Sequence, residues 1–139
     1  DDYAHHPSEI AATLEAVSGC WPVRRRVVVF QPHRYTRTHD LLDEFAALLA
    51  TEPHLVVTGV YPAGEAVIAS ASGAVLCERI RALGGVDPVY LEDVSLLPDK
   101  LPELVQPGDI VLTLGAGNIG RVARELVGKQ SQGTEGGIE

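Results

Sequence analysis

One segment of the sequence concentrates side chains that bind anions. Residues 31–39 read QPHRYTRTH and hold two arginines and two histidines. Arg34 and Arg37 lie three positions apart, so within one helical turn both guanidinium groups fall on the same side and can hold a carboxylate or phosphate. Alternatively, both arginines form surface ion pairs with the acidic residues that follow, namely Asp40, Asp43 and Glu44. The residue types leave both interpretations open.

The first seven residues, DDYAHHP, place two carboxylates, a phenol and two imidazoles just ahead of an expected helix. A helix N-terminus favours anions, and an aspartate in such a loop can accept hydrogen bonds from ribose hydroxyls. Either aspartate could equally cap the helix or stabilise a turn. A metal site built from His5, His6, His33 and an aspartate is disfavoured, because no pair has the i, i+4 spacing of a zinc-binding helix.

Residues 115–120 read GAGNIG and match the G-x-G-x-x-G pattern of dinucleotide-binding loops, directly after an expected strand and at the start of a helix. That pattern also requires a second strand with an acidic residue roughly 20 positions on, and here a polar segment follows the helix instead. A nicotinamide-dinucleotide-binding module therefore remains the alternative function. Glycine could also serve a tight turn or close packing of a helix on a strand.

A further turn, residues 61–65 (YPAGE), carries a single carboxylate. Glu65 could receive the ammonium group of a ligand, although a lone exposed glutamate is more often only solvated. If Glu65 shares an edge with Arg34 and Arg37, the anion and cation sites together suit an amino-acid zwitterion.

Alternating helices and strands must position these loops. Apolar spacing predicts helices over 7–19, 40–50, 72–83 and 118–127. Short runs rich in β-branched residues predict strands over 26–30, 55–60, 88–91 and 109–114, and the prolines within 93–105 allow only broken helical turns. This order predicts an α/β fold, a three-layer, Rossmann-like, mainly parallel sheet with helices on both faces. Because ligands bind beyond the carboxyl ends of parallel strands, all four loops should meet at one edge.

Composition narrows the class of protein. The 139 residues suffice for one domain, and the formal charge of −8 opposes general binding to nucleic acid or to an anionic membrane. No apolar run is long enough to span a bilayer, and no signal segment opens the chain. Two isolated cysteines suggest a reducing, cytoplasmic setting. Without an initiating methionine, we expect an excised domain, covering 1–127, with a flexible polar tail or linker over 128–139.

Four motifs in this order, DDYAHHP, FQPHRYTRT, VYPAGEA and GAGNIGRVA, resemble the C-terminal domain of the Mur ligase family, and most closely the members that add L-alanine to UDP-N-acetylmuramate in peptidoglycan synthesis. The resemblance implies an ATP-dependent, amide-bond-forming ligase. In this family ATP phosphorylates the lactyl carboxylate, Mg²⁺ screens the phosphates, and the amine of L-alanine attacks the acyl phosphate. The phosphate-binding loop G-x-x-x-x-G-K-[ST] belongs to the central domain and does not occur in these residues, so we expect the isolated chain to be inactive.

The resemblance also assigns roles by position. Asp2 matches the family's ribose-binding aspartate, whereas ATP and Mg²⁺ are held mainly by the central domain. The remaining matched positions line the amino-acid site, with the two arginines as carboxylate clamps: Tyr3, His5, His33, Arg34, Arg37, Glu65, Gly115, Gly117 and Asn118. No catalytic residue is assigned in this segment, because orienting the amine is an entropic contribution that needs no general base.

Overall fold

The computed structural model describes residues 1–137, and the side chains of residues 1–128. Within these residues a single four-stranded sheet has the order β3-β2-β1-β4, and every pair of neighbouring strands is parallel. The strands are β1 (Arg26–Phe30), β2 (Leu55–Thr58), β3 (Val89–Leu91) and β4 (Ile110–Leu114). The predicted parallel sheet is confirmed.

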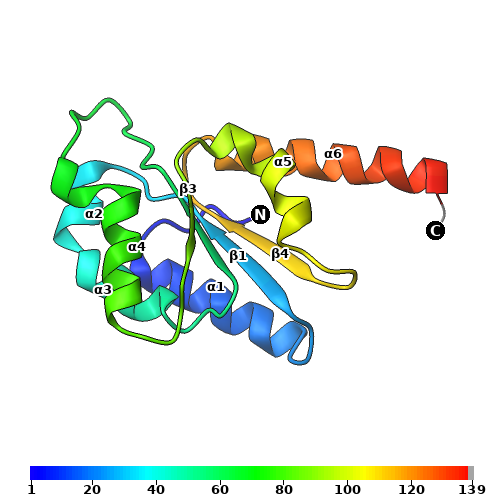
Figure 1. Ribbon diagram of the computed structural model, residues 1–139, viewed down its shortest axis with the longest axis horizontal. Coiled ribbons are helices and arrows are strands. Elements are labelled where there is room, and N and C mark those ends of the chain that lie inside the picture. The colour runs from blue at the N-terminus through cyan, green and yellow to red at the C-terminus, as the bar shows by residue number, and fades with distance from the viewer. Residues whose placement is uncertain (138–139) are drawn as a thin grey trace.

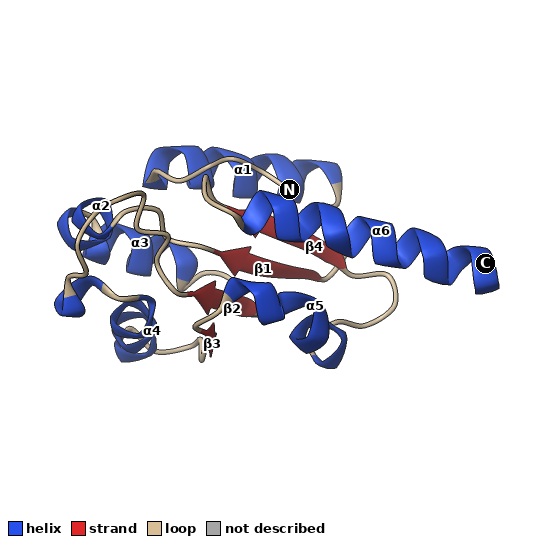
Figure 2. Cartoon of the chain, turned by 90° about the horizontal axis from the view of Figure 1, so that it is seen from above, coloured by secondary structure: helices blue, strands red, loops and turns tan. Residues whose placement is uncertain are grey.

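Helices cover both faces of this sheet (Figures 1 and 2). One face carries α1 (Pro7–Cys20), α3 (Leu42–Leu49) and α4 (Gly73–Ala82), and the other carries α5 (Leu97–Lys100) and α6 (Ile119–Gly137). Shorter elements complete the described chain: α2 (Tyr35–Asp40) and the 3₁₀ turns η1 (Ala69–Ala71), η2 (Val94–Leu96) and η3 (Leu101–Glu103). The predicted three-layer arrangement is therefore also confirmed.

The central strand β1 shows why a continuous apolar run forms here. Val28 and Phe30 pack with α1, α3 and α4, while Val27 and Val29 face η2, α5 and α6. Successive side chains of a strand point to opposite faces, so a strand covered on both sides needs apolar residues at every position. All four of these side chains are at most 1% exposed.

Two helices differ from their predicted bounds. The helix expected over 40–50 is α3, and an unpredicted helix, α2, precedes it; the two are separated at Leu41, where the backbone leaves helical geometry (φ −115°, ψ 20°). The last helix, α6, begins near the expected position but extends to Gly137 instead of ending near Val127. Residues 128–137 contain no proline, and a glycine costs a helix only about 1 kcal/mol. The side chains of residues 129–139 lie outside the described part of the chain. The flexible tail predicted over 128–139 therefore stays a prediction.

None of the described helices combines the length and the apolar character that crossing a bilayer requires.

Candidate functional site

The four chemistry-bearing loops meet at the carboxyl edge of the sheet, as predicted. Asp2 pairs in parallel with Leu114 at the end of β4, and His33 pairs in parallel with Tyr61 beyond the ends of β1 and β2. Between these two bridges, the N–H of Gln31 donates to the carbonyl of Leu114 over 2.9 Å. Backbone hydrogen bonds thus fix the loops relative to one another.

The segment 31–39 is not a loop throughout, because α2 begins at Tyr35. Arg34 stands at its N-terminus with φ 73° and ψ 137°, a conformation that non-glycine residues rarely adopt. Three hydrogen bonds hold this geometry: the N–H of Arg34 donates to the Tyr61 carbonyl (2.8 Å), and the N–H and hydroxyl of Thr38 donate to the Arg34 carbonyl (3.2 and 2.8 Å). Strain of this kind persists only where the surrounding contacts enforce it.

Arg37 is tied to His33. Its Nη1 donates to the carbonyl of His33 over 3.0 Å and lies 3.1 Å from the Nδ1 of the same residue. Because a guanidinium is always a donor, Nδ1 must accept, and a neutral ring then carries its proton on Nε2. Burial, followed by the charge of Arg37, lowers the pKa of His33, which favours this neutral form at pH 7. His33 can therefore offer an Nε2–H donor.

Arg34 lies near Glu65 instead of the acidic residues that follow it. Its Nη1 is 3.9 Å from Oε2 of Glu65, and within residues 1–128 neither Arg34 nor Arg37 pairs with the three acidic side chains considered above, Asp40, Asp43 and Glu44. Glu65 itself accepts from the N–H (3.0 Å) and hydroxyl (2.6 Å) of Thr36, and these bonds lower the pKa of Glu65. Glu65 thus caps α2, a role that sequence reasoning missed.

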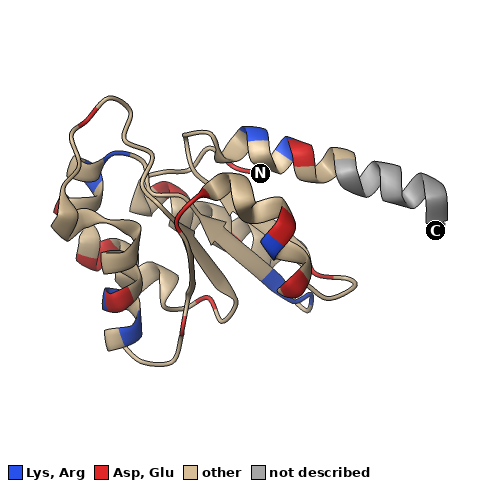
Figure 3. Ribbon diagram, turned by 45° about the horizontal axis from the view of Figure 1, so that its top comes forward, with Lys and Arg blue, Asp and Glu red and all other residues tan. Residues whose placement is uncertain are grey.

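The N-terminal arm adds two rings to this group. The rings of Tyr3 and His5 meet edge-on with centroids 5.4 Å apart, and His5 lies 5.7 Å from His33. Tyr3 is 70% exposed, so its ring is accessible to a ligand. One surface therefore carries the candidate residues Tyr3, His5, His33, Arg34, Arg37 and Glu65. The basic residues in the segment leading into α2 form one of several small basic groups on the fold, and acidic residues lie between these groups (Figure 3).

The GAGNIG loop packs tightly against the chain itself. A Cβ at Gly115 would lie 2.8 Å from Ile119, and Gly115 has φ +155°. The N–H of Gly115 donates to the Asp2 carbonyl (3.1 Å), and the N–H of Ile119 donates to Oε1 of Gln31 (3.2 Å). Two amides of the would-be dinucleotide loop are thus already bonded within the chain. Close packing accounts for these glycines.

Gln31 is a second residue that sequence reasoning left without a role. It is 3% exposed, and its amide nitrogen donates to Oδ1 of Asn118 over 2.7 Å. Together with the bond to Ile119, this contact fastens the loop after β1 to the loop after β4. The signal available in the sequence was a glutamine directly after the apolar run of residues 27–30.

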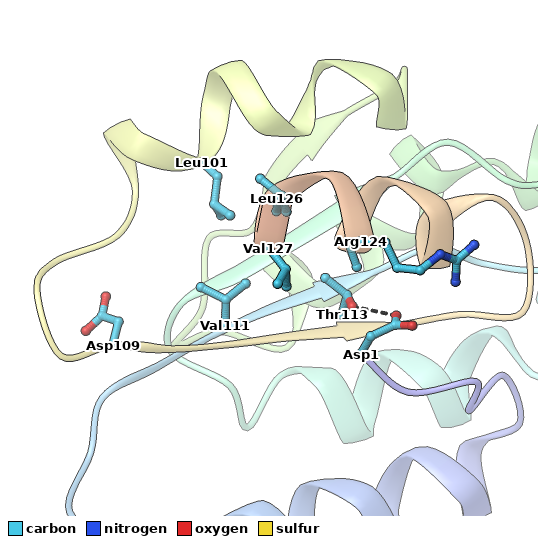
Figure 4. Close-up of a pocket in the computed structure, with 9 residues that line it drawn as sticks. Asp1, Leu101, Asp109, Val111, Thr113, Arg124, Leu126 and Val127 are labelled. Atoms are coloured by element: carbon cyan, nitrogen blue, oxygen red, sulfur yellow. Dashed lines mark hydrogen bonds between the residues drawn. The ribbon is translucent and has the colours of Figure 1, made fainter. Parts of the chain in front are cut away.

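The two N-terminal aspartates differ in their contacts. Oδ1 of Asp2 accepts from the N–H of Ala4 (2.8 Å), and within residues 1–128 its second oxygen makes no hydrogen bond. Asp2 is therefore able to accept from a hydroxyl. Asp1 instead accepts from the hydroxyl of Thr113 (2.7 Å) in an apolar pocket between β4 and α6 (Figure 4), away from the residues predicted to line the site. Within the described residues no three His, Cys, Asp or Glu side chains form a metal-binding group.

Comparisons with known proteins agree with this geometry. The family described as "Mur ligase, glutamate ligase domain" matches residues 1–117. The UDP-N-acetylmuramate--L-alanine ligase of Burkholderia multivorans is 52% identical over 95% of this chain and 28% of its own length, and that of Methylococcus capsulatus is 52% identical over 91% and 27%. The chain thus spans about a quarter of these relatives.

Solved structures have the same fold. The crystal structure of UDP-N-acetylmuramate-alanine ligase from Thermotoga maritima superimposes with a TM-score of 0.72 and 27% identity, over 96% of this chain and 26% of that one. A domain of a ligase from Haemophilus ducreyi, at 22% identity and a TM-score of 0.64, shares the fold over 92% of this chain and 87% of that one. By family match, sequence identity and fold, the chain belongs to the Mur ligase family and corresponds to its C-terminal domain.

Proposed function

We propose that this chain is the C-terminal domain of a ligase that uses ATP to join L-alanine to UDP-N-acetylmuramate in peptidoglycan synthesis. It supplies the amino-acid pocket and one wall of the nucleotide site and is inactive alone. The observation that carries the proposal is the group formed by Arg34, Arg37, His33 and His5 at the loop edge, in a chain whose net charge is −8. The names of relatives at 52% identity support the same reaction.

The proposed pocket recognises both ends of a small zwitterion. Arg34, whose side chain is 45% exposed, and Arg37 bind the carboxylate of L-alanine with charge-assisted hydrogen bonds. The Nε2–H of His33 provides a further donor, and Tyr3 and His5 form the adjacent wall. Glu65, together with the Gly115, Gly117 and Asn118 loop, borders the pocket. Glu65 already accepts two hydrogen bonds from Thr36. Its main role is therefore to place a negative charge beside Arg34, and binding of the ammonium group is secondary.

The nucleotide is bound mainly elsewhere in the ligase. One carboxylate oxygen of Asp2 accepts from the N–H of Ala4, and the other accepts a hydrogen bond from a ribose hydroxyl. When bound, ATP with Mg²⁺ supplies the phosphoryl group that activates the lactyl carboxylate. The residues of this chain hold the amine of L-alanine close to that carboxyl, and fixing two reactants in place lowers the entropic part of the barrier. The unpaired cysteines, Cys20 and Cys77, are consistent with the cytoplasm as the compartment.

The test uses the full-length ligase. Arg34→Ala should raise KM for L-alanine at least tenfold, since a charge-assisted hydrogen bond contributes roughly 1.5–3 kcal/mol, and should leave KM for UDP-N-acetylmuramate within about twofold. Arg81→Ala is the matched control, because Arg81 pairs with Asp87 at the far end of α4. Unchanged alanine kinetics in the Arg34 variant would contradict the carboxylate clamp, and absence of L-alanine ligation by the wild-type enzyme would contradict the proposed reaction.

A further inference from the structure

Tyr61 ties the loop after β2 to the segment before α2. Its N–H donates to the carbonyl of Pro32, and its own carbonyl accepts from the N–H of Arg34, both over 2.8 Å. These two bonds form the parallel bridge between Tyr61 and His33. The backbone of Tyr61 therefore holds the segment that carries the arginines.

The side chain of Tyr61 stacks on His33. The two rings are nearly parallel, at 11°, and their centroids are 5.5 Å apart, a distance within the range of offset aromatic pairs. The centroid of the His5 ring lies 5.7 Å from that of His33, and the centroid of the Tyr3 ring lies 5.4 Å from that of His5. Four rings from three loops thus form a continuous row, with Tyr61 at its inner end. In this row His33 is fixed on one side by Arg37 and on the other by Tyr61.

Gly117 leaves the space that the Tyr61 ring occupies. A Cβ at position 117 would lie 2.5 Å from Cγ and 2.8 Å from Cβ of Tyr61, closer than real Cβ contacts allow. Tyr61 therefore touches the loop after β4 as well as the segment before α2. This contact explains why glycine is required at position 117 without any ligand.

We propose that Tyr61 is a positioning residue for the amino-acid site: its ring, seated against Gly117, holds the imidazole of His33 in the orientation in which its Nε2–H faces the bound amino acid. This inference rests on the proposed function. Tyr61 itself need not touch L-alanine. It acts through His33, so the part of the side chain that matters is the ring, and the hydroxyl is dispensable.

The experiment compares Tyr61→Phe and Tyr61→Leu in the full-length ligase. Phenylalanine keeps the stack, so all kinetic constants should stay within about twofold of wild type. Leucine fills similar volume without a ring, and loss of an aromatic pair should raise KM for L-alanine roughly two- to tenfold, with KM for UDP-N-acetylmuramate within about twofold. Tyr90→Leu is the matched control, because Tyr90 is another half-buried tyrosine, on β3, and packs on the core instead of the loops.

A spectroscopic readout isolates the effect on His33. With ¹³C-labelled histidine, the His33 resonances, assigned through His33→Gln, should be displaced by the ring current of Tyr61 in the wild type and in Tyr61→Phe, but not in Tyr61→Leu. The pKa of His33, lowered mainly by burial, should rise in the leucine variant because water reaches the ring. Thermal unfolding of each variant checks that the fold is retained.

The possible outcomes distinguish a failure of the inference about Tyr61 from a failure of the proposed ligase function. Unchanged alanine kinetics in a folded Tyr61→Leu enzyme would overturn the inference, as would equal changes in both KM values or equal damage from Tyr90→Leu. A Tyr61→Phe enzyme as impaired as Tyr61→Leu would also overturn it, since the hydroxyl would then be the active group. A wild-type enzyme that does not ligate L-alanine would refute the proposed function and remove the basis of the inference, whatever the His33 signals show.

Discussion

Adding one methyl group at Gly117 tests how tightly the site is packed. The φ of Gly117 lies outside the left-handed region, so any cost of Gly117→Ala comes from contacts and not from the backbone. The new Cβ would lie 2.5 Å from Cγ of Tyr61 and 2.8 Å from Oε1 of Gln31. Overpacking typically costs about 1–3 kcal/mol, and moving Gln31 weakens its bond to Ile119, worth about 1 kcal/mol. We therefore expect a loss of about 2–4 kcal/mol.

Urea unfolding of the 139-residue chain measures this loss as a lower midpoint with an unchanged slope. The matched control is Gly19→Ala near the end of α1, where a Cβ meets nothing within 4 Å. That substitution should stabilise the chain by up to about 1 kcal/mol, because alanine is the better helix former. If Gly117→Ala unfolds within about 0.5 kcal/mol of the wild type, the close contact between the loops is not a real constraint and the reasoning fails.

Three further predictions concern the rest of the domain. Glu52 is 2% exposed and accepts two hydrogen bonds of 2.8 Å from Arg26, so Glu52→Gln should lower the free energy of unfolding by about 3 kcal/mol in urea; a loss below about 1 kcal/mol would contradict a buried ion pair. Because folding lowers the pKa of Glu65, its carboxylate stabilises the fold at any pH above its ordinary pKa of 4.5. This contribution disappears as the pH falls through the lower pKa that Glu65 has in the folded protein. Glu65→Gln should thus be less stable than wild type at pH 7, with a gap that narrows at pH 3, and a gap independent of pH would argue against the cap. Burial raises the pKa of Cys77 to about 11, so iodoacetamide at pH 8 should label exposed Cys20 first and Cys77 only after unfolding, as mass spectrometry would show; equal labelling rates would refute this.

The strands were predictable because their signal is local. The run RVVVF forms β1 over the predicted residues 26–30, and β4 begins one position inside its predicted range. Both of these strands are short, rich in β-branched residues and covered on both faces, so burial and propensity agree. The alternation of strands and helices also predicted that the strands are parallel, and hence the edge at which the loops meet, but not the order of the strands in the sheet.

The helix α2 was not predictable because its cause lies elsewhere in the chain. Its sequence, YTRTHD, has no apolar periodicity. The helix depends on Glu65, which accepts from the N–H of Thr36 in the first turn, and on the Tyr61 carbonyl, which accepts from the N–H of Arg34. Contacts with Tyr61 and Glu65, 27 and 29 positions away from their partners in the sequence, thus decided the structure of a segment whose own pattern is typical of a loop.

The candidate residues themselves were identified by type, but their partners were not. Arg34 and Arg37 lie at one site, and the alternative pairing with Asp40, Asp43 and Glu44 does not form among the described side chains. Gln31 and Tyr61 were passed over because each acts across loops. The bond from Gln31 to Asn118 joins residues 87 positions apart, and no local pattern encodes such a contact.

The sheet order has a consequence for synthesis of the protein. The central strand β1 pairs with β2 early in the chain, but its other neighbour, β4, comes last of the four strands. Asp2 also cannot form its bridge until β4 has been synthesised, because its partner Leu114 lies 112 positions later in the chain. A ribosome that has released only residues up to β3 therefore exposes one edge of β1, and loops separated this far in sequence close slowly. The edge that gathers Asp2, the arginines and Gly117 is completed only when nearly the whole domain has emerged, so an incomplete chain cannot form the proposed amino-acid site.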